Sequence, residues 1–385
     1  MRAFVLADPA LASHAGQFVW LDLNTDRTEN EAVLQKHEAD ALPTFLVVDP
    51  SDEKVVLRWV GSFTVPQAEA FLEEARQKMS GAAAAASPAD AALDRADRLY
   101  GGRDYPAAIP AYREALKLAP AGWRPRHRAI EALLYSYQST DAYTDAVALA
   151  RETLPGLAAT PSALVVGTGG LDCALELPKD ASGRAQAVAE LEAALRTAIA
   201  DPKLQAAADD RSGAYGSLLA ARKQAGDTEG ARRVASQWAA FLEAEAARAQ
   251  SPDARAVFDS HRLSAYLELG QPEKAVPMLQ ASARDLPEDY NPANRLARAY
   301  ASLKQWDRAI AASQQAERLA SGRAKLRVLA ARAGIYAEKG DKKAARRTYE
   351  QAIAYGESLP PAERPEKQLE QLRKQRDKLE GKATS

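Results

Sequence analysis

The side chains that most often carry chemistry are sparse in this chain of 385 residues. There is one cysteine, Cys173, and a lone thiol can neither close a disulfide within the chain nor run dithiol exchange. The four histidines are scattered, and none has a second histidine or cysteine three or four residues further on. We therefore expect no metal site and no cofactor. The histidines are His14, His37, His127 and His261.

A glycine-rich stretch, LVVGTGGLD at residues 164–172, is the nearest approach to a nucleotide motif. It lacks the third glycine of G-x-G-x-x-G, because Asp172 stands there, and helical segments flank it. We expect a loosely packed helix or a loop in this stretch, and we expect Cys173 to be a small buried apolar residue. The carboxylate pairs at residues 73–74 and 209–210 are predicted to be solvated.

The overall charge argues against polyanionic partners. The chain has 51 basic and 52 acidic residues, a net charge of -1, and 46% apolar residues. We expect no nucleic-acid binding and no membrane insertion. Asp8 and Pro9 interrupt any apolar core of a signal peptide, so the N-terminus indicates no targeting segment. Composition leaves the compartment open. We expect a cytoplasmic protein for the chain as given, and a periplasmic or exported one if a signal peptide lies upstream.

Residues 1–80 have the pattern of a small α/β unit. Residues 18–23 (FVWLDL) predict a strand, residues 30–39 a helix, and TFLVV after Pro43 a buried strand. A tight turn then leads to residues 55–61 (VVLRWVG), which predicts an antiparallel hairpin. From Val65 to Met79 the apolar spacing is that of an amphipathic helix, with Thr64 as its N-cap.

This order, with Leu42-Pro43-Thr44 before the buried strand, resembles the C-terminal part of the thioredoxin fold. The resemblance implies a cis proline and makes Leu42, Pro43 and Thr44 a loop beside a groove for extended substrates. The Cys-x-x-Cys half is missing, and so is the strand that would lie between the two surviving sheet elements. Two explanations stay open. Either the true start lies upstream of Met1, or the gene carries a decayed half domain.

Residues 81–88 predict a linker, and residues 89–360 read as helical repeats that are degenerate at 161–205. In RDYPAAIPAYREALKLAP small residues stand where two helices would touch, and the frame returns near Ala275, Ala309 and Ala345 at close to 34-residue spacing. This pattern resembles the tetratricopeptide repeat. It implies about six stacked hairpins, closed by a charged capping helix and tail at residues 361–385.

The fold class predicted is therefore mainly α, a tetratricopeptide-type α-solenoid preceded by a truncated α/β thioredoxin-like domain. The repeat resemblance places Asn291, Asn294, Arg298 and Arg327 on the groove side, where amides and guanidinium groups could bind a peptide. We expect a scaffold that binds a protein or peptide partner and has no catalytic residues in the chain as given. The alternative is a thiol-disulfide oxidoreductase whose cysteine pair is encoded upstream of Met1.

Overall fold

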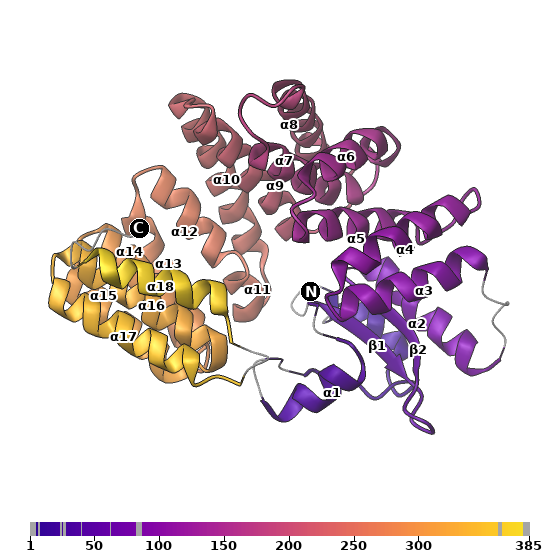
Figure 1. The fold of residues 1–385 in the computed structure, drawn as a ribbon, viewed down its shortest axis with the longest axis horizontal. Helices are drawn as coiled ribbons and strands as arrows, with labels where there is room; N and C mark the ends of the chain where they lie inside the picture. The colour runs from indigo at the N-terminus through magenta and orange to yellow at the C-terminus, as the bar shows by residue number, and fades with distance from the viewer. Residues whose placement is uncertain are drawn as a thin grey trace. The chain divides into compact units, whose positions relative to one another are not determined.

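The computed structural model describes residues 5–6, 8–23, 25, 28–39, 41–61, 63–81, 87–360 and 364–379 (Figure 1). The chain forms two compact units, residues 1–23 with 29–234, and residues 235–385 with 24–28. Helix α10, Thr228–Arg248, spans the boundary. Residues 82–86 of the predicted linker, and residues 361–363 and 380–385 of the predicted cap and tail, lie outside the described residues.

The predicted mainly α architecture is confirmed. Short 3-10 helices and α1 precede a two-stranded sheet, and helices follow to the end of the described chain. In the first unit the elements are η2 Pro9–His14, η3 Thr28–Asn30 (Thr28 itself belongs to the second unit), α1 Glu31–Lys36, β1 Thr44–Val48, β2 Val55–Val60, α2 Val65–Met79, α3 Pro88–Gly101, α4 Tyr105–Leu118, α5 Arg126–Ser139, α6 Tyr143–Leu157, α7 Ser162–Glu176, α8 Arg184–Ala200 and α9 Ala208–Gln224. In the second unit they are α11 Pro252–Ala256, α12 Asp259–Glu268, η4 Pro272–Lys274, α13 Ala275–Asp285, α14 Tyr290–Ser302, α15 Trp306–Leu319, α16 Gly322–Lys339, α17 Lys342–Glu357 and α18 Glu366–Lys378.

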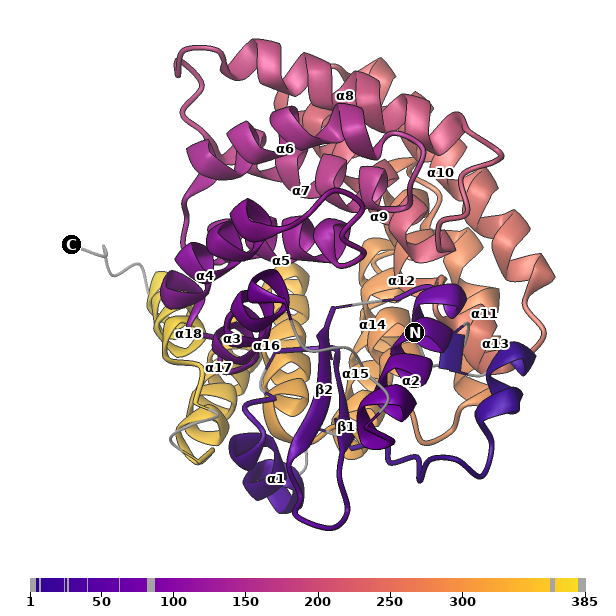
Figure 2. The same cartoon turned by 90° about the vertical axis from the view of Figure 1, so that its right-hand side faces the viewer.

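The hairpin predicted for residues 44–60 is present, with β1 antiparallel to β2 and α2 beside it (Figure 2). The peptide bond between Leu42 and Pro43 is cis. Helix α2 begins where predicted, and the backbone N–H of Thr64 donates to Oε1 of Gln67 at 2.8 Å. One face of the hairpin packs on α2 around Phe71. Apolar burial between sheet and helix therefore holds this small region together.

The strand predicted at residues 18–23 is wrong. In the described residues the sheet consists of β1 and β2 alone, and residues 19–23 have no regular secondary structure. Val19 is 89% exposed and Leu21 is 80% exposed. β-rich composition favours a strand only where a neighbouring strand can pair with it, and among the described residues the sheet order contains no strand from this segment.

Seven successive helix pairs run from α3/α4 to α16/α17 in the described residues, one more than the six expected. The pair α7/α8 occupies the degenerate stretch, as predicted. The glycine-rich residues 164–172 lie inside α7, so the alternative of a loop is wrong, and the helix is not loosely packed. A Cβ at Gly170 would lie 2.5 Å from the Cβ of Ala150, and one at Gly169 would lie 2.8 Å from Leu134. These glycines permit close helix contact.

The second unit ends in the charged helix α18, as predicted for a cap. Its Leu369 and Leu372 are buried with Leu326, Tyr349 and other residues of α16 and α17. The opposite side of α18 carries exposed charged pairs such as Lys374 with Glu370. A helix of this kind covers the apolar face of the last hairpin and presents a polar surface to water.

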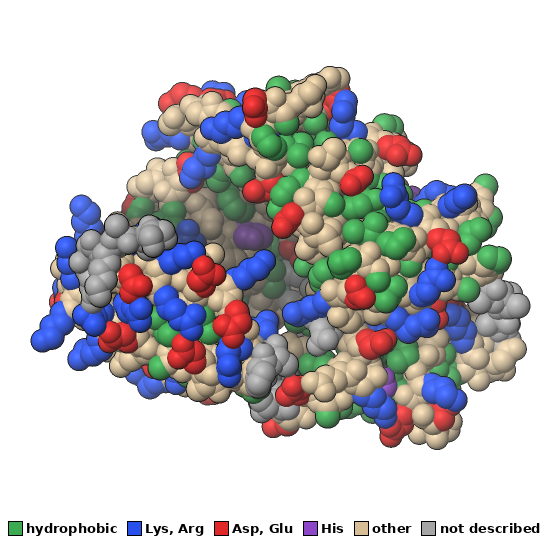
Figure 3. Space-filling view, viewed as in Figure 1, with side chains coloured by type: hydrophobic (Ala, Val, Ile, Leu, Met, Phe, Trp, Pro, Cys, Tyr) green, Lys and Arg blue, Asp and Glu red, His purple; other side chains and the backbone are tan. Residues whose placement is uncertain are grey.

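Charged groups of both signs are interspersed on the face shown in Figure 3, in keeping with the balanced composition. Among the helices that the structure describes, none is long and apolar enough to cross a bilayer.

Candidate functional site

A pocket of about 370 Å³ opens in the first unit, beside the loop that precedes β1. Three of its walls are tyrosine rings, and we call it the tyrosine pocket. Its volume is within the range of small ligand sites and suits one or two side chains of a bound peptide. It is lined by Ala41, Leu42, Tyr100, Arg103, Tyr105 and Tyr135.

The turn between α3 and α4 brings three of these residues to one corner. Tyr100 lies in the last turn of α3, and Tyr105 begins α4, which Asp104 caps by accepting a hydrogen bond from the backbone N–H of Ala107 at 3.2 Å. Arg103 adopts a φ of +60° in the turn between them. Tight local geometry therefore fixes the spacing of two rings and a guanidinium group.

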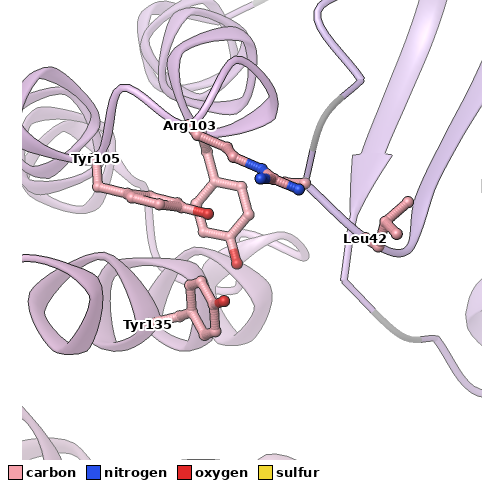
Figure 4. A pocket seen from close by; sticks show the side chains of 6 residues that line it. Leu42, Arg103, Tyr105 and Tyr135 are labelled. Atoms are coloured by element: carbon pink, nitrogen blue, oxygen red, sulfur yellow. The ribbon is translucent and has the colours of Figure 1, made fainter. Parts of the chain in front are cut away.

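The three rings form a close aromatic cluster. The Tyr100 centroid lies 5.3 Å from that of Tyr105 and 5.6 Å from that of Tyr135, and Tyr105 and Tyr135 are 5.7 Å apart. Tilted and edge-on ring pairs at these distances are favourable. Figure 4 shows the rings converging while Arg103 extends toward Leu42. The cluster offers ring faces and hydroxyl groups together.

Exposure differs among the lining residues in a way that suits a binding site. Tyr100 is 8% exposed, whereas Tyr135 is 48% exposed and Leu42 is 62% exposed. Burial, followed by the neighbouring Tyr135 and Tyr105, raises the pKa of Tyr100 well above its usual range. Burial and Tyr135 also raise the pKa of Tyr105. The hydroxyls of Tyr100 and Tyr105 are therefore protonated at neutral pH.

One backbone hydrogen bond ties the loop to the first helix pair, and the Arg58 side chain of β2 holds the residues that precede the loop. The N–H of Ala41 donates to the carbonyl of Gly101 at 3.1 Å, and Nη1 of Arg58 donates to the carbonyl of Glu38 at 2.8 Å. A Cβ at Gly101 would lie 2.3 Å from the Glu38 carbonyl oxygen, so the backbones approach as closely as glycine allows. The loop at residues 41–42 is therefore in direct contact with the end of α3, and both line the tyrosine pocket.

A buried polar network lies beneath the same helices. Asp97 accepts hydrogen bonds from the Tyr112 hydroxyl and from Nη1 of Arg128, each at 2.7 Å. The Arg128 guanidinium carbon lies 4.8 Å from the centroid of the Trp59 ring on β2. The exposed fractions of Asp97, Tyr112 and Arg128 are all below 10%. This network joins the hairpin to α3, α4 and α5.

Of the loop residues predicted from the sequence, only Leu42 lines the pocket. Thr44 begins β1 and its hydroxyl donates to the Ala41 carbonyl at 2.6 Å, while the Pro43 carbonyl accepts from Gly61 at 2.9 Å. Sequence reasoning missed the tyrosines as a site. The available signal was that Tyr100 and Tyr135 recur about one repeat length apart, with Tyr105 in the intervening turn.

The predicted peptide-binding residues lie in the second unit. Asn291, Asn294 and Arg298 follow one face of α14, and Arg298 is exposed. Nη2 of Arg327 on α16 approaches the Tyr290 hydroxyl at 3.4 Å, which places it beside the start of α14. The side-chain amide of Asn291 donates a hydrogen bond at 2.8 Å to Asp289, the N-cap residue of α14.

The lone thiol and the acidic pair at residues 209–210 lie in at least partly buried surroundings. Cys173 is buried, and burial followed by Asp172 raises the pKa of its thiol to about 12, far from that of a nucleophile. The prediction that Asp209 and Asp210 are solvated is wrong. Both are only partly exposed, and burial, then Asp209 and Glu131, raises the pKa of Asp210 to about 7. No group of three or more possible metal ligands occurs among the described residues.

Comparison with known proteins identifies the repeat type. Residues 326–355, in α16 and α17, match the family model of the tetratricopeptide repeat. No curated protein matches the chain. Among solved structures, a tetratricopeptide repeat protein from Parabacteroides merdae is 12% identical, with 75% of this chain and 98% of that chain covered and a TM-score of 0.47. The TPR2AB domain of yeast Sti1, in a complex with pHSP90, is 14% identical over 75% and 98%, with a TM-score of 0.28.

These structural similarities are too low to assign the ligand of either protein to this chain. The match gives α16 and α17 as a tetratricopeptide repeat, and the mainly helical architecture of successive helix pairs agrees with an α-solenoid fold class.

Proposed function

We propose that this protein is a scaffold that binds an extended segment of a partner protein, and that the tyrosine pocket is its principal contact. Solenoids of helical hairpins present long surfaces suited to extended peptides. The observation that carries the proposal is the convergence of Leu42, Arg103 and three tyrosines on one opening. Exposed apolar and aromatic groups beside hydroxyl and guanidinium donors are the composition of a protein-binding hot spot.

The chemistry of the pocket favours a peptide with an apolar side chain next to a free carbonyl. The tyrosine faces would take the apolar side chain, and the Tyr135 hydroxyl or Arg103 would donate to backbone oxygen. Arg103 disfavours a cationic side chain in the same opening, although tyrosine rings alone would attract one.

In this proposal residues 1–80 are a thioredoxin-like remnant that supplies the Leu42 wall and no catalysis. The strand, turn and helix order of β1, β2 and α2 supports the resemblance. The lone cysteine of the chain, Cys173, is buried in α7, away from any pattern typical of disulfide exchange.

The proposal is tested by selecting peptides from a displayed library on the purified protein and measuring their affinity for variants. Tyr135→Ala is expected to weaken binding by roughly 10- to 100-fold, the loss typical of an aromatic anchor. Tyr143→Ala is the matched control, because Tyr143 lies outside the pocket and its hydroxyl donates to Asp141. Equal affinity of the Tyr135 variant and wild type would reject the pocket as the site.

The α14 surface of Asn291, Asn294, Arg298 and Arg327 is a second proposed contact. Its support is the contact between Arg327 and the Tyr290 hydroxyl, which places Arg327 beside the first turn of α14, the helix that carries the other three residues. Replacing Asn294 and Arg298 together by alanine should reduce partner binding without changing the tyrosine pocket. Undiminished binding would remove this surface from the proposal.

A further inference from the structure

The backbone carbonyls around the tyrosine pocket already hold donors from within the chain. The Tyr100 carbonyl accepts from the Arg103 N–H at 2.9 Å, and the Gly101 carbonyl accepts from the Ala41 N–H at 3.1 Å. The Ala41 carbonyl accepts from the Thr44 hydroxyl at 2.6 Å. A ligand N–H that entered beside these groups would lose its water and would have to share an acceptor with a bond already formed. The pocket therefore disfavours a ligand residue that brings an N–H with it.

Proline is the residue that has no backbone N–H. We propose that the ligand of the tyrosine pocket is a proline-rich segment in the polyproline II conformation, with a proline ring packed on the tyrosine rings. This inference rests on the proposed function and names the class of its peptide. It makes the missing N–H and the ring of proline the two properties that the pocket selects.

The aromatic walls suit the compact ring of proline. The rings of Tyr100 and Tyr105 are edge-on at 82°, and the ring of Tyr135 is tilted by 47° to that of Tyr100, so both faces and edges line the opening. The face of a tyrosine ring is the negative part of its quadrupole. The C–H groups next to the proline nitrogen carry partial positive charge because the amide withdraws electrons from them, so they are attracted to such a face. Aromatic-lined grooves bind proline-rich segments in this way.

The charged group at the opening is a donor. Arg103 lines the pocket and extends toward Leu42 (Figure 4), and a guanidinium group donates hydrogen bonds without accepting any. A polyproline II segment makes no internal hydrogen bonds, so all its carbonyls are available to a donor. The carbonyls of a helical ligand would be used within the helix, and an extended ligand without proline would carry an N–H at every residue.

Both surfaces are rigid before they meet, which matters for a small opening. The N–H of Asp104 donates to the Leu99 carbonyl at 2.8 Å and closes the turn that sets the pocket corner, and Tyr100 is nearly buried. A pocket of about 370 Å³ contacts few ligand residues, so little binding energy is available to order a flexible peptide. Proline fixes the polyproline II conformation in advance and lowers that cost.

The first test measures binding of a fluorescein-labelled peptide of nine prolines to the full chain by fluorescence anisotropy. We expect saturable binding to wild type, roughly 10- to 100-fold weaker binding to Tyr135→Ala and roughly 3- to 10-fold weaker binding to Leu42→Ala. Both side chains are exposed, so their truncation leaves the fold intact. Tyr143→Ala is the matched control with unchanged affinity, because Tyr143 does not line the pocket. No binding to wild type, or equal affinity of Tyr135→Ala and wild type, overturns the inference.

The second test separates the two properties of proline. Labelled peptides of nine alanines and of nine N-methylalanines are compared with the proline peptide, because alanine restores the N–H whereas N-methylalanine lacks both the N–H and the ring. We expect the alanine peptide to bind at least 10-fold more weakly than the proline peptide, and the N-methylalanine peptide to fall between them. An alanine peptide that binds as well as the proline peptide, or an N-methylalanine peptide that binds no better than the alanine peptide, overturns the inference.

The peptides selected from the displayed library distinguish this inference from the proposed function. Selected peptides that depend on Tyr135 and repeatedly carry proline support both. Peptides that depend on Tyr135 but contain no proline overturn the inference and leave the proposed function standing. Peptides whose affinity does not depend on Tyr135 overturn both.

Discussion

The Asp97 network offers the sharpest test of how the hairpin is attached to the solenoid. Replacing Asp97 by alanine removes the acceptor of both the Tyr112 hydroxyl and the Arg128 guanidinium. Arg128 is only 9% exposed, so its charge would stay buried without its counter-ion. Breaking a buried pair in this way typically costs 3–5 kcal/mol. The lost tyrosine hydrogen bond adds about 1 kcal/mol, and the two losses overlap because they share one carboxylate.

We therefore expect Asp97→Ala to lower the local stability of α3, α4 and α5 by about 4 kcal/mol. Repeat arrays unfold in segments, so a single unfolding midpoint would mix this effect with that of distant hairpins. Hydrogen exchange resolves the segments. A loss of 4 kcal/mol corresponds to roughly 1,000-fold faster exchange of the protected amides in these helices, with those of α16 and α17 unchanged.

Two further variants separate charge from packing. Arg95→Ala removes an exposed ion pair between Arg95 on α3 and Glu114 on α4. It should change the opening free energy measured by hydrogen exchange by less than about 1 kcal/mol. Asp97→Leu combined with Arg128→Met removes both charges and should recover most of the loss. If Asp97→Ala exchanged no faster than Arg95→Ala, the buried network would not hold the hairpin and the reasoning would fail.

Three other predictions concern separate parts of the chain. Asp210 has a pKa of about 7 in the folded protein, above its value in the unfolded chain, so the folded state binds the proton more tightly. The ionised carboxylate therefore destabilises the folded state. This destabilisation is absent below the unfolded pKa and complete above pH 7. Asp210→Asn should therefore stabilise α9 by on the order of 1–2 kcal/mol at pH 8, discounted for its partial exposure, and by little at pH 4, as measured by hydrogen exchange of α9 at both values. Gly170→Ala should cost about 1–3 kcal/mol, because its Cβ meets Ala150, whereas Gly213→Ala, with open space in α9, should be neutral or stabilising, each measured by hydrogen exchange of its own helix. Leu369→Ala should cost about 2–4 kcal/mol and accelerate hydrogen exchange in α17, and unchanged exchange there would show that α18 is not a cap.

The helical part was predictable because the same residue pattern recurs in successive hairpins, so each helix assignment is supported by several copies of the pattern. Small residues recur at the contacts of successive hairpins, and Ala309 and Ala345 are fully buried where the repeat frame requires it. The hairpin of β1 and β2 was also predictable, since Pro50 and Asp52 mark the turn between two apolar runs. Local patterns sufficed for these elements.

The errors arose where the outcome depends on distant partners. Residues 18–23 have strand composition, but pairing requires a neighbour that composition cannot reveal. Asp210 belongs to a helix whose sequence looks solvated, and its raised pKa depends on burial and on Glu131 from another helix. The tyrosine pocket was missed for the same reason, because its rings come from three helices and its fourth wall is the Leu42 loop.

The tyrosine pocket and the buried Asp97 network share the helices α3, α4 and α5. Tyr100 lies one turn beyond Asp97 on α3, and its ring contacts Tyr112, which donates to Asp97, at 6.2 Å between centroids. Arg128 on α5 lies two turns before Tyr135. The helices that hold the three pocket tyrosines are thus held in register by one buried carboxylate. Under the proposed function, a variant of Asp97, which does not line the pocket, should therefore still weaken peptide binding, because it disturbs the helices that hold the pocket tyrosines.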